Sequence, residues 1–380
     1  MEIKKVHIKS EKISLPAIGI GTAGYGGNFT KDSSYKGDYN SNKLFIDLIL
    51  TAYDCGARVI DTAENYAEGA SEEIIGALPE SIKSDLFIMT KFSPSSSGPG
   101  DITKALNRSL KRLNRDYVDL YQPHWPSEVN FEEMADELLN LVHEGKIKHI
   151  GLSNFSISDL KKINSFLPSN KIKFLQADYG LLERSAEVEY LTTFKEGNLI
   201  LVSYSPLNGG GIFNQDAKNF KRVKNIAEDN NATIAQLVLA WVIRSGSVLT
   251  IPKSSTKERV IENFRTLTMN FKPESLEELS KIFKIEVTNI DPGLIDILPA
   301  GDRPIYFTLE EAIDNKYNLV PGPIEVAKEI ELAGGKLSKP IKLKKIENSI
   351  RYQLVEGRIK LWGWKILFGE NAPIPSIIIQ

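Results

Sequence analysis

The chain has 380 residues, enough for one large α/β domain and a smaller second domain. Hydrophobic residues make up 42% of it and charged residues 25%, a balance that excludes a disordered or fibrous chain. The 47 basic and 49 acidic side chains give a formal net charge of -2, so no nucleic-acid partner is expected.

The sequence indicates a cytoplasmic protein without a membrane partner. The N-terminus is charged and lacks the apolar core of a signal peptide. The longest apolar run, Leu237–Ile243, is far shorter than the roughly 20 residues that cross a bilayer. The single cysteine, Cys55, can form no internal disulfide, which is typical of a reducing compartment.

Short apolar segments alternate with amphipathic ones over most of the chain. Segments such as Leu86–Lys91 are apolar at nearly every position, as parallel strands buried on both faces are. Eight such strands separated by helices predict an α/β fold, a (β/α)8 TIM barrel. The predicted strands are Ala17–Thr22, Arg58–Ala63, Leu86–Lys91, Tyr117–Pro123, His149–Asn154, Phe174–Tyr179, Ile200–Ser205 and Val248–Pro252.

Amphipathic periodicity predicts the helices between these strands. A short alternating hairpin before the first strand is expected to close the bottom of the barrel. The predicted helices are Leu44–Tyr53, Ile102–Leu113, Glu132–His143, Glu187–Phe194, Asp216–Asn230 and Thr233–Arg244.

The alternation of predicted strands and helices ends near residue 290. The run DPGLIDILPAGDRP is rich in proline and glycine and predicts a linker. We therefore place a barrel domain at 1–288, a linker at 289–303 and a small α+β accessory domain at 304–380.

Four polar residues lie at or just beyond the carboxyl ends of neighbouring predicted strands, where the chemistry of such a barrel takes place. They are Asp61, Tyr66, Lys91 and His124. A lysine beside a tyrosine is expected to lower the pKa of the phenol, and an aspartate can hold that lysine in place. Each residue type alone commonly has a structural role, but their convergence predicts a proton donor. No metal site is indicated.

These segments resemble the aldo-keto reductase family. IDTAENYAEGASEEIIGAL (59–78) is similar to the family signature, and TIPKSSTKERVIENF (250–264) is similar to its cofactor signature. The segments MTK, DYVDLYQPHW and GKIKHIGLSNF lie between them in the family's order, although Ala67 stands where many members have glycine. The resemblance covers about residues 1–285.

The resemblance implies a catalytic tetrad of Asp61, Tyr66, Lys91 and His124. Tyr66 would be the general acid or base while hydride passes between NADP(H) and a carbonyl or alcohol carbon. Tyr204 would stack on the nicotinamide, a role for which Tyr179 competes. The implied cofactor-binding residues are Gly21, Thr22, Ser153, Asn154, Gln176, Tyr204, Ser205, Pro206, Leu207, Gly209, Lys253, Ser254, Arg259, Glu262 and Asn263.

The residues after the eighth predicted strand favour NADP(H) over NAD(H). Lys253, Ser254, Ser255 and Arg259 cluster at a predicted helix N-terminus. Cations, hydroxyls and free backbone N–H groups there make an anion site that suits the 2′-phosphate. A solvated basic helix start is the structural alternative.

Three aromatic residues follow strand ends and are candidates for the substrate pocket wall. They are Tyr25, Phe92 and Trp125, and packing in the core is an equal alternative for each. The polar insertion at 26–42 is expected to form part of the rim. The sequence leaves the substrate, the reaction direction and the oligomeric state open.

The segment 352–379 resembles the ParB/sulfiredoxin-like domain, with Gly357 and Arg358 in its turn and IPSIII as its closing strand. Sulfiredoxin chemistry needs a cysteine in that turn, which this chain lacks. Besides a simple reductase, two other functions stay open for this chain. One is a redox-sensing or regulatory protein that binds NADP(H). The other is a bifunctional enzyme with a nucleotide-binding C-terminal module.

Overall fold

The computed structural model describes residues 3–27, 39–93, 100–126, 130–168, 171–189, 199–284, 286–298, 306–317, 319, 321–337 and 340–379. The chain divides into two compact units, Met1–Phe283 and Lys284–Gln380. In the described part of the chain, no helix has the length and apolar character needed to cross a membrane.

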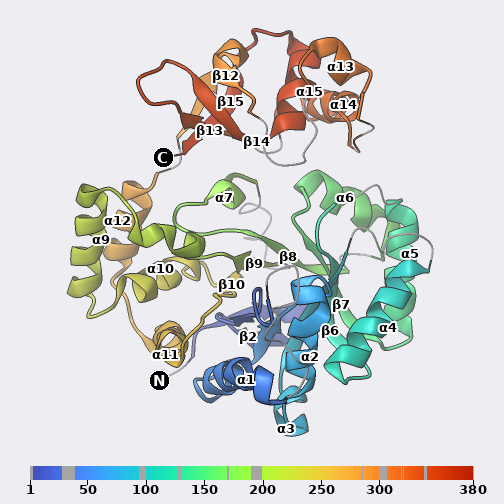
Figure 1. The fold of residues 1–380 in the computed structure, drawn as a ribbon, viewed down its shortest axis with the longest axis vertical. Helices are drawn as coiled ribbons and strands as arrows, with labels where there is room; N and C mark the ends of the chain where they lie inside the picture. The colour runs from blue at the N-terminus through green and yellow to red at the C-terminus, as the bar shows by residue number, and fades with distance from the viewer. Residues whose placement is uncertain are drawn as a thin grey trace. The chain divides into compact units, whose positions relative to one another are not determined.

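The first unit contains the predicted barrel. Its eight parallel strands are hydrogen-bonded in chain order, and a parallel bridge between Ile18 and Thr250 joins the last strand to the first. In Figure 1 the helices surround these central strands. The strands are β3 (Ile20–Gly21), β4 (Val59–Asp61), β5 (Phe87–Phe92), β6 (Val118–Pro123), β7 (Ile147–Ser153), β8 (Ile172–Asp178), β9 (Ile200–Tyr204) and β10 (Val248–Thr250).

Each predicted strand of the barrel overlaps an observed one. The strands form because their apolar residues are buried on both faces, against the barrel interior and against the helices. In β5, for example, Ile88 and Met89 are neighbours in sequence and both are fully buried. The main difference is length, because β3 keeps only two of the six predicted residues.

Hydrogen-bonding side chains fix where several outer helices begin. Ser156 and Asp159 form a capping box before α6, and Thr233 and Gln236 form another before α10. The helices of this unit are α1 (Tyr39–Asp54), α2 (Ala70–Gly76), α3 (Glu80–Lys83), α4 (Asp101–Leu113), α5 (Phe131–His143), α6 (Ile157–Phe166), α7 (Ser185–Glu189), α9 (Ala217–Asp229), α10 (Ile234–Val242), α11 (Lys257–Arg265) and α12 (Pro273–Ile282). Part of the predicted helix Glu187–Phe194 and much of the insertion at 26–42 lie outside the described residues.

The N-terminal hairpin covers the end of the barrel opposite the candidate site. Strands β1 (Lys5–Ile8) and β2 (Ile13–Pro16) pair antiparallel, as expected. Lys173, near the start of β8, donates a hydrogen bond to Ser10 Oγ at 3.4 Å. The carboxyl ends of the strands are therefore left for the functional site.

The second unit has its own core and a mixed five-stranded sheet. Part of the predicted linker 289–303 is structured instead, because Val287–Ile290 and Ile295–Asp296 pair with later strands. The sheet order is β11 (Val287–Ile290), β15 (Ile374–Ile379), β13 (Ile341–Lys345), β14 (Tyr352–Glu356) and β12 (Ile295–Asp296). Its helices are α13 (Leu309–Ile313), α14 (Pro323–Leu332) and α15 (Arg358–Phe368).

Candidate active site

The four predicted catalytic residues lie at the carboxyl ends of three adjacent strands. Asp61 is the last residue of β4, Lys91 lies near the end of β5, and His124 directly follows β6. Tyr66 begins the short turn η2 (Tyr66–Gly69) that follows β4, in which Ala67 and Glu68 have non-helical backbone angles. The parallel register of the barrel brings these four side chains together.

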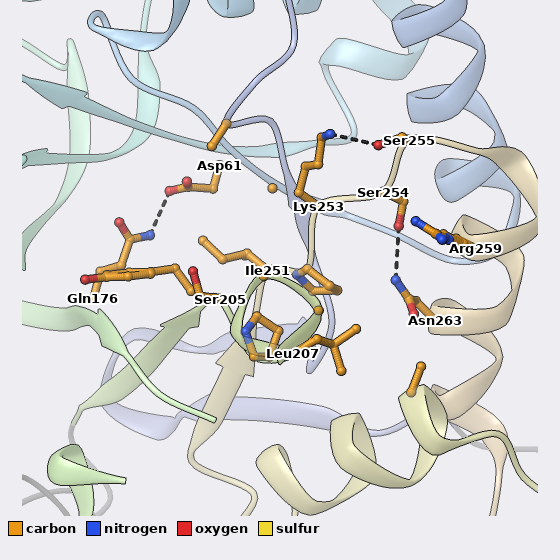
Figure 2. A pocket seen from close by; sticks show the side chains of 18 of the residues that line it. Asp61, Gln176, Ser205, Leu207, Ile251, Lys253, Ser254, Ser255, Arg259 and Asn263 are labelled. Atoms are coloured by element: carbon orange, nitrogen blue, oxygen red, sulfur yellow. Dashed lines mark hydrogen bonds between the residues drawn. The ribbon is translucent and has the colours of Figure 1, made fainter. Parts of the chain in front are cut away.

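Lys91 contacts two of the other three predicted catalytic residues. Its ammonium donates to Asp61 Oδ2 and to the Thr62 carbonyl, each at 2.8 Å, and it lies 3.3 Å from Tyr66 Oη. Gln176 donates to the other oxygen of Asp61 at 2.8 Å, a contact drawn in Figure 2. Lys91 and Asp61 are both almost completely buried, so their charges compensate each other inside the barrel.

The electrostatics differ from the sequence-based prediction in one respect. Burial raises the pKa of Tyr66 above its ordinary value, and the Lys91 ammonium opposes this only in part. The predicted lowering of the pKa is therefore wrong for this structure, and Tyr66 is a protonated phenol. Burial lowers the pKa of Lys91, but Asp61 and Tyr66 together raise it above the ordinary value, so the lysine keeps its charge.

His124 is held as a neutral imidazole. Burial, together with the Lys91 charge, lowers its pKa to about 3. Its ring stands edge-on to Tyr66, with 5.5 Å between the ring centroids. Its buried Nδ1 has no hydrogen-bond partner among the described residues. A neutral imidazole beside the phenol can hydrogen-bond an oxygen atom placed between them.

A chain of hydrogen bonds links amide and hydroxyl groups at the carboxyl ends of β7, β8 and β9. Tyr204 donates to Asn154 Oδ1 at 2.8 Å, and Asn154 donates to Ser153 Oγ at 3.2 Å. Ser153 donates in turn to Gln176 Oε1 at 3.4 Å. Asn154 has φ +64, a left-handed conformation that asparagine tolerates better than most residues. These groups therefore form one fixed wall of donors and acceptors.

One cavity of about 880 Å³ joins this wall to the proposed phosphate site. It contains most of the residues predicted for catalysis and for the cofactor. The predicted residues that line it are Gly21, Asp61, Tyr66, His124, Trp125, Ser153, Asn154, Gln176, Tyr204, Ser205, Pro206, Leu207, Gly209, Lys253, Ser254, Ser255, Arg259, Glu262 and Asn263. Six further residues that were not predicted also line it, namely Ala23, Gly210, Phe213, Ala235, Ile251 and Pro252.

Some of these six cavity residues could have been predicted from their neighbours in the sequence. Gly210 continues the glycine run that includes the predicted Gly209, and Ile251 and Pro252 directly precede the predicted Lys253. Ala235 lies in the first turn of α10, and no local pattern indicates that this turn reaches the cavity.

Two of the three aromatic candidates do not line the cavity. Tyr25 is 1% exposed, stacks on Phe45 and donates to the Ser254 carbonyl at 3.2 Å. Phe92 is fully buried against Tyr121. The prediction of a pocket wall is wrong for both, because their rings pack into the core behind the strand ends. Trp125 lines the cavity and is 39% exposed.

Two further predicted residues lie behind the cavity wall. Thr22 is fully buried and donates to the Asp61 carbonyl at 2.8 Å, so its hydroxyl does not face a ligand. Lys91 is 1% exposed and contacts two residues that line the cavity, Asp61 and Tyr66. Tyr179, the competitor of Tyr204, is buried and bonded to Glu187 and Arg244.

The far end of the cavity is polar and cationic. Lys253 donates to Ser255 Oγ at 2.8 Å, and Asn263 donates to Ser254 Oγ at 3.0 Å. Arg259 extends beside Ser254 from the first turn of α11 (Figure 2). A helix N-terminus with two cations and two serine hydroxyls is an arrangement that holds phosphate groups.

The described residues contain no group of three or more His, Cys, Asp or Glu side chains that could hold a metal ion.

Comparison with known proteins agrees with this geometry. Residues 17–284 match the model of the aldo/keto reductase family. Methylglyoxal reductase YeaE of Escherichia coli is 30% identical over 284 residues, covering 74% of this chain and 96% of the relative. A crystal structure of an aldo-keto reductase from Klebsiella pneumoniae in complex with NADPH is 30% identical with a TM-score of 0.66. It covers 74% of this chain and 96% of that one.

A second crystal structure is similar over the same unit. A thermostable aldo-keto reductase in complex with the inhibitor epalrestat is 33% identical, with a TM-score of 0.67, and covers 73% of this chain and 99% of that chain. The matched residues include the whole barrel and every residue of the cavity described above. On the evidence of its fold, its site and these matches, the chain belongs to the aldo/keto reductase family.

Proposed function

We propose that the barrel catalyses NADP(H)-dependent reduction of a small aldehyde or ketone, or the reverse oxidation of an alcohol. The observation that carries the proposal is the position of Lys91, which contacts both Asp61 and Tyr66 at the cavity wall. When bound, the cofactor supplies the hydride, and the protein supplies orientation and the proton.

The proton is assigned to Tyr66. Its pKa is raised by burial, so the phenol carries its proton at neutral pH. As negative charge develops on a substrate oxygen, Tyr66 donates the proton to it, and the Lys91 ammonium stabilises the phenolate that remains. Asp61 keeps Lys91 in place through the contact at 2.8 Å. Neutral His124 orients the same oxygen by hydrogen bonding.

The cavity fits the cofactor in the chemistry of its lining. The amide and hydroxyl groups of Ser153, Asn154 and Gln176 suit a carboxamide, and Tyr204 offers an aromatic face beside them. Lys253 and Arg259 at the start of α11 suit the 2′-phosphate of NADP(H). Leu207 and Gly209 line the same cavity and would lie along the pyrophosphate.

The substrate is assigned to the small carbonyl compounds. The Escherichia coli relative named above is a methylglyoxal reductase, and the same class of small oxoaldehyde is the first candidate for this chain. Trp125 next to His124 provides an aromatic wall at that end of the cavity.

Steady-state turnover by the full-length chain tests the proposal. Methylglyoxal and a panel of aldehydes, ketones and sugars are mixed with NADPH, and the loss of NADPH absorbance is followed. We expect turnover by the wild type and a loss of about 10²- to 10⁴-fold in Tyr66→Phe, with the affinity for NADPH retained. Tyr121→Phe is the matched control, because Tyr121 is buried, does not line the cavity and donates to a backbone carbonyl, that of Ile102, at 3.4 Å.

The outcomes of these measurements distinguish the reductase from the redox-sensing protein and test the role of Tyr66. Tight binding of NADPH without turnover of any carbonyl compound would favour the redox-sensing function. Activity of Tyr66→Phe equal to that of Tyr121→Phe would remove Tyr66 from the mechanism.

For the second unit, the ParB-like resemblance remains our proposal. Gly357 has φ +102, which glycine adopts readily, and Arg358 directly begins α15. The segment 374–379 forms strand β15, which lies between β11 and β13 in the sheet. Titration of the full-length chain with CTP and ATP tests for a nucleotide site, with Arg358→Ala as the comparison. Absence of binding would leave the unit without a nucleotide function.

A further inference from the structure

The chain leaves the candidate catalytic tyrosine through an unusual turn. Ala67, Glu68 and Gly69, which directly follow Tyr66, have φ values of +49, +53 and +89. Two successive non-glycine residues in the left-handed region are unfavourable, so the surrounding structure must hold the turn in place. Ala67 is fully buried, which leaves it no room to adjust independently of its neighbours.

The other end of this turn is fixed by a buried polar network. Ser71 and Glu72, in the first turn of α2, are both fully buried. Ser71 Oγ lies 2.6 Å from Thr22 Oγ1 and 2.9 Å from Thr62 Oγ1. These two threonines directly follow β3 and β4, so Ser71 ties α2 to two strand ends.

Glu72 makes the charged part of the network. Its Oε1 accepts from Thr90 Oγ1 at 2.6 Å, and its Oε2 accepts from the Arg112 guanidinium at 2.6 Å and 2.7 Å. Thr90 immediately precedes Lys91 in β5, and Arg112 comes from α4. Arg112 also packs on the turn itself, because a Cβ atom on Gly69 would lie 2.6 Å from Arg112 Cδ.

We propose that Glu72 is a positioning residue, which uses Thr90 and Arg112 to hold the left-handed turn and thereby keeps the Tyr66 hydroxyl beside Lys91. This inference rests on the proposed function of Tyr66. Glu72 touches neither the cavity nor the reacting groups, and its charge is compensated by Arg112. Its effect is therefore geometric and leaves the protonation of Tyr66 unchanged.

The experiment compares Glu72→Gln with Asp119→Asn in the full-length chain. Asp119 is a matched buried carboxylate near the start of β6, at the opposite end of the barrel, where it accepts from Ile88 N at 2.9 Å and from Lys148 at 3.0 Å. Both variants are expected to unfold at lower urea concentration than the wild type. Only Glu72→Gln is expected to lose kcat, by about 10- to 100-fold, with KM and the pH profile unchanged.

A second substitution tests the role of the turn directly. Ala67→Gly places a residue that adopts positive φ readily at the strained position. In the Glu72→Gln background it is expected to restore part of the lost kcat, which a general loss of stability would not explain. Equal kcat in Glu72→Gln and Asp119→Asn, or no recovery with Ala67→Gly, would overturn the proposal.

Hydrogen exchange provides a readout that does not depend on turnover. Glu72→Gln is expected to increase amide exchange over residues 62–76 more than Asp119→Asn does. If exchange there is the same in both variants, the positioning proposal fails even if the enzyme is active. If the wild type turns over no carbonyl compound, the proposed function fails while the exchange result still decides whether Glu72 holds the turn.

Discussion

The imidazole of His124 meets the phenol ring of Tyr66 edge-on, at an interplanar angle of 75° and a centroid distance of 5.5 Å. This contact places a neutral hydrogen-bonding group beside the proton donor, because the pKa of His124 is lowered to about 3 by burial and by Lys91. The pair has consequences for the pH dependence of both activity and stability.

The first prediction concerns acid stability. In the unfolded chain a histidine has a pKa of about 6.5, so below that pH the unfolded state binds a proton that the folded state refuses. His124 therefore lowers the free energy of unfolding as the pH falls from about 6.5 towards 3. Urea unfolding at pH 7 and pH 5 should show a larger loss for the wild type than for His124→Asn. An identical loss would mean that the imidazole is protonated in the folded chain.

The second prediction concerns the buried ion pair. Lys91→Met leaves the Asp61 carboxylate without its cation and is expected to destabilise the fold by about 3–5 kcal/mol at neutral pH. Burial already raises the pKa of Asp61 above its ordinary value, and the Lys91 charge opposes this rise. Without Lys91, the folded-state pKa of Asp61 rises further. Stability from the protonated acid is then present at low pH and is lost as the pH rises through the folded-state pKa.

The destabilisation of Lys91→Met should therefore shrink between pH 7.5 and pH 5, as measured by urea unfolding. The double variant Lys91→Met/Asp61→Leu serves as the control, because it removes both charges. It should recover stability at neutral pH but not activity. A pH-independent loss would show that the ion pair is not what holds these strand ends.

The third prediction concerns the choice of cofactor. Arg259→Ala removes a cation at the start of α11, the end of the cavity assigned to the 2′-phosphate, which NADPH has and NADH lacks. The Kd for NADPH is expected to rise by about 10-fold or more, since hydrogen bonds to charged groups contribute roughly 1.5–3 kcal/mol. The Kd for NADH should change little. Fluorescence titration measures both, and equal losses would contradict the phosphate assignment.

The fourth prediction separates the aromatic candidates. Trp125→Ala is expected to raise KM for the carbonyl substrate without reducing stability, because the side chain is 39% exposed and lines the cavity. Phe92→Ala should instead reduce stability by about 3–5 kcal/mol, because the ring is fully buried. Thermal unfolding and steady-state kinetics on the two variants check this contrast. Unchanged KM in Trp125→Ala would place the substrate elsewhere.

The local sequence pattern was sufficient to predict the barrel and the types of residue at its site. Buried parallel strands have a distinctive apolar run, and the strands β4, β5 and β6 end within two residues of their predicted ends. Because parallel strands end at one face, the sequence alone indicated that Asp61, Lys91 and His124 converge. The resemblance to the family then supplied roles for these residues, which pattern alone could not.

The tertiary structure decided which side chains face the cavity and what their surroundings do to them. Tyr25, Phe92 and Trp125 look alike in sequence, yet only Trp125 lines the cavity, because the other two rings pack into the core. The pKa of Tyr66 depends on the balance between burial and the Lys91 charge, and burial prevails. The buried Glu72–Arg112 pair joins residues 40 positions apart in the chain, a contact that only the folded chain brings together.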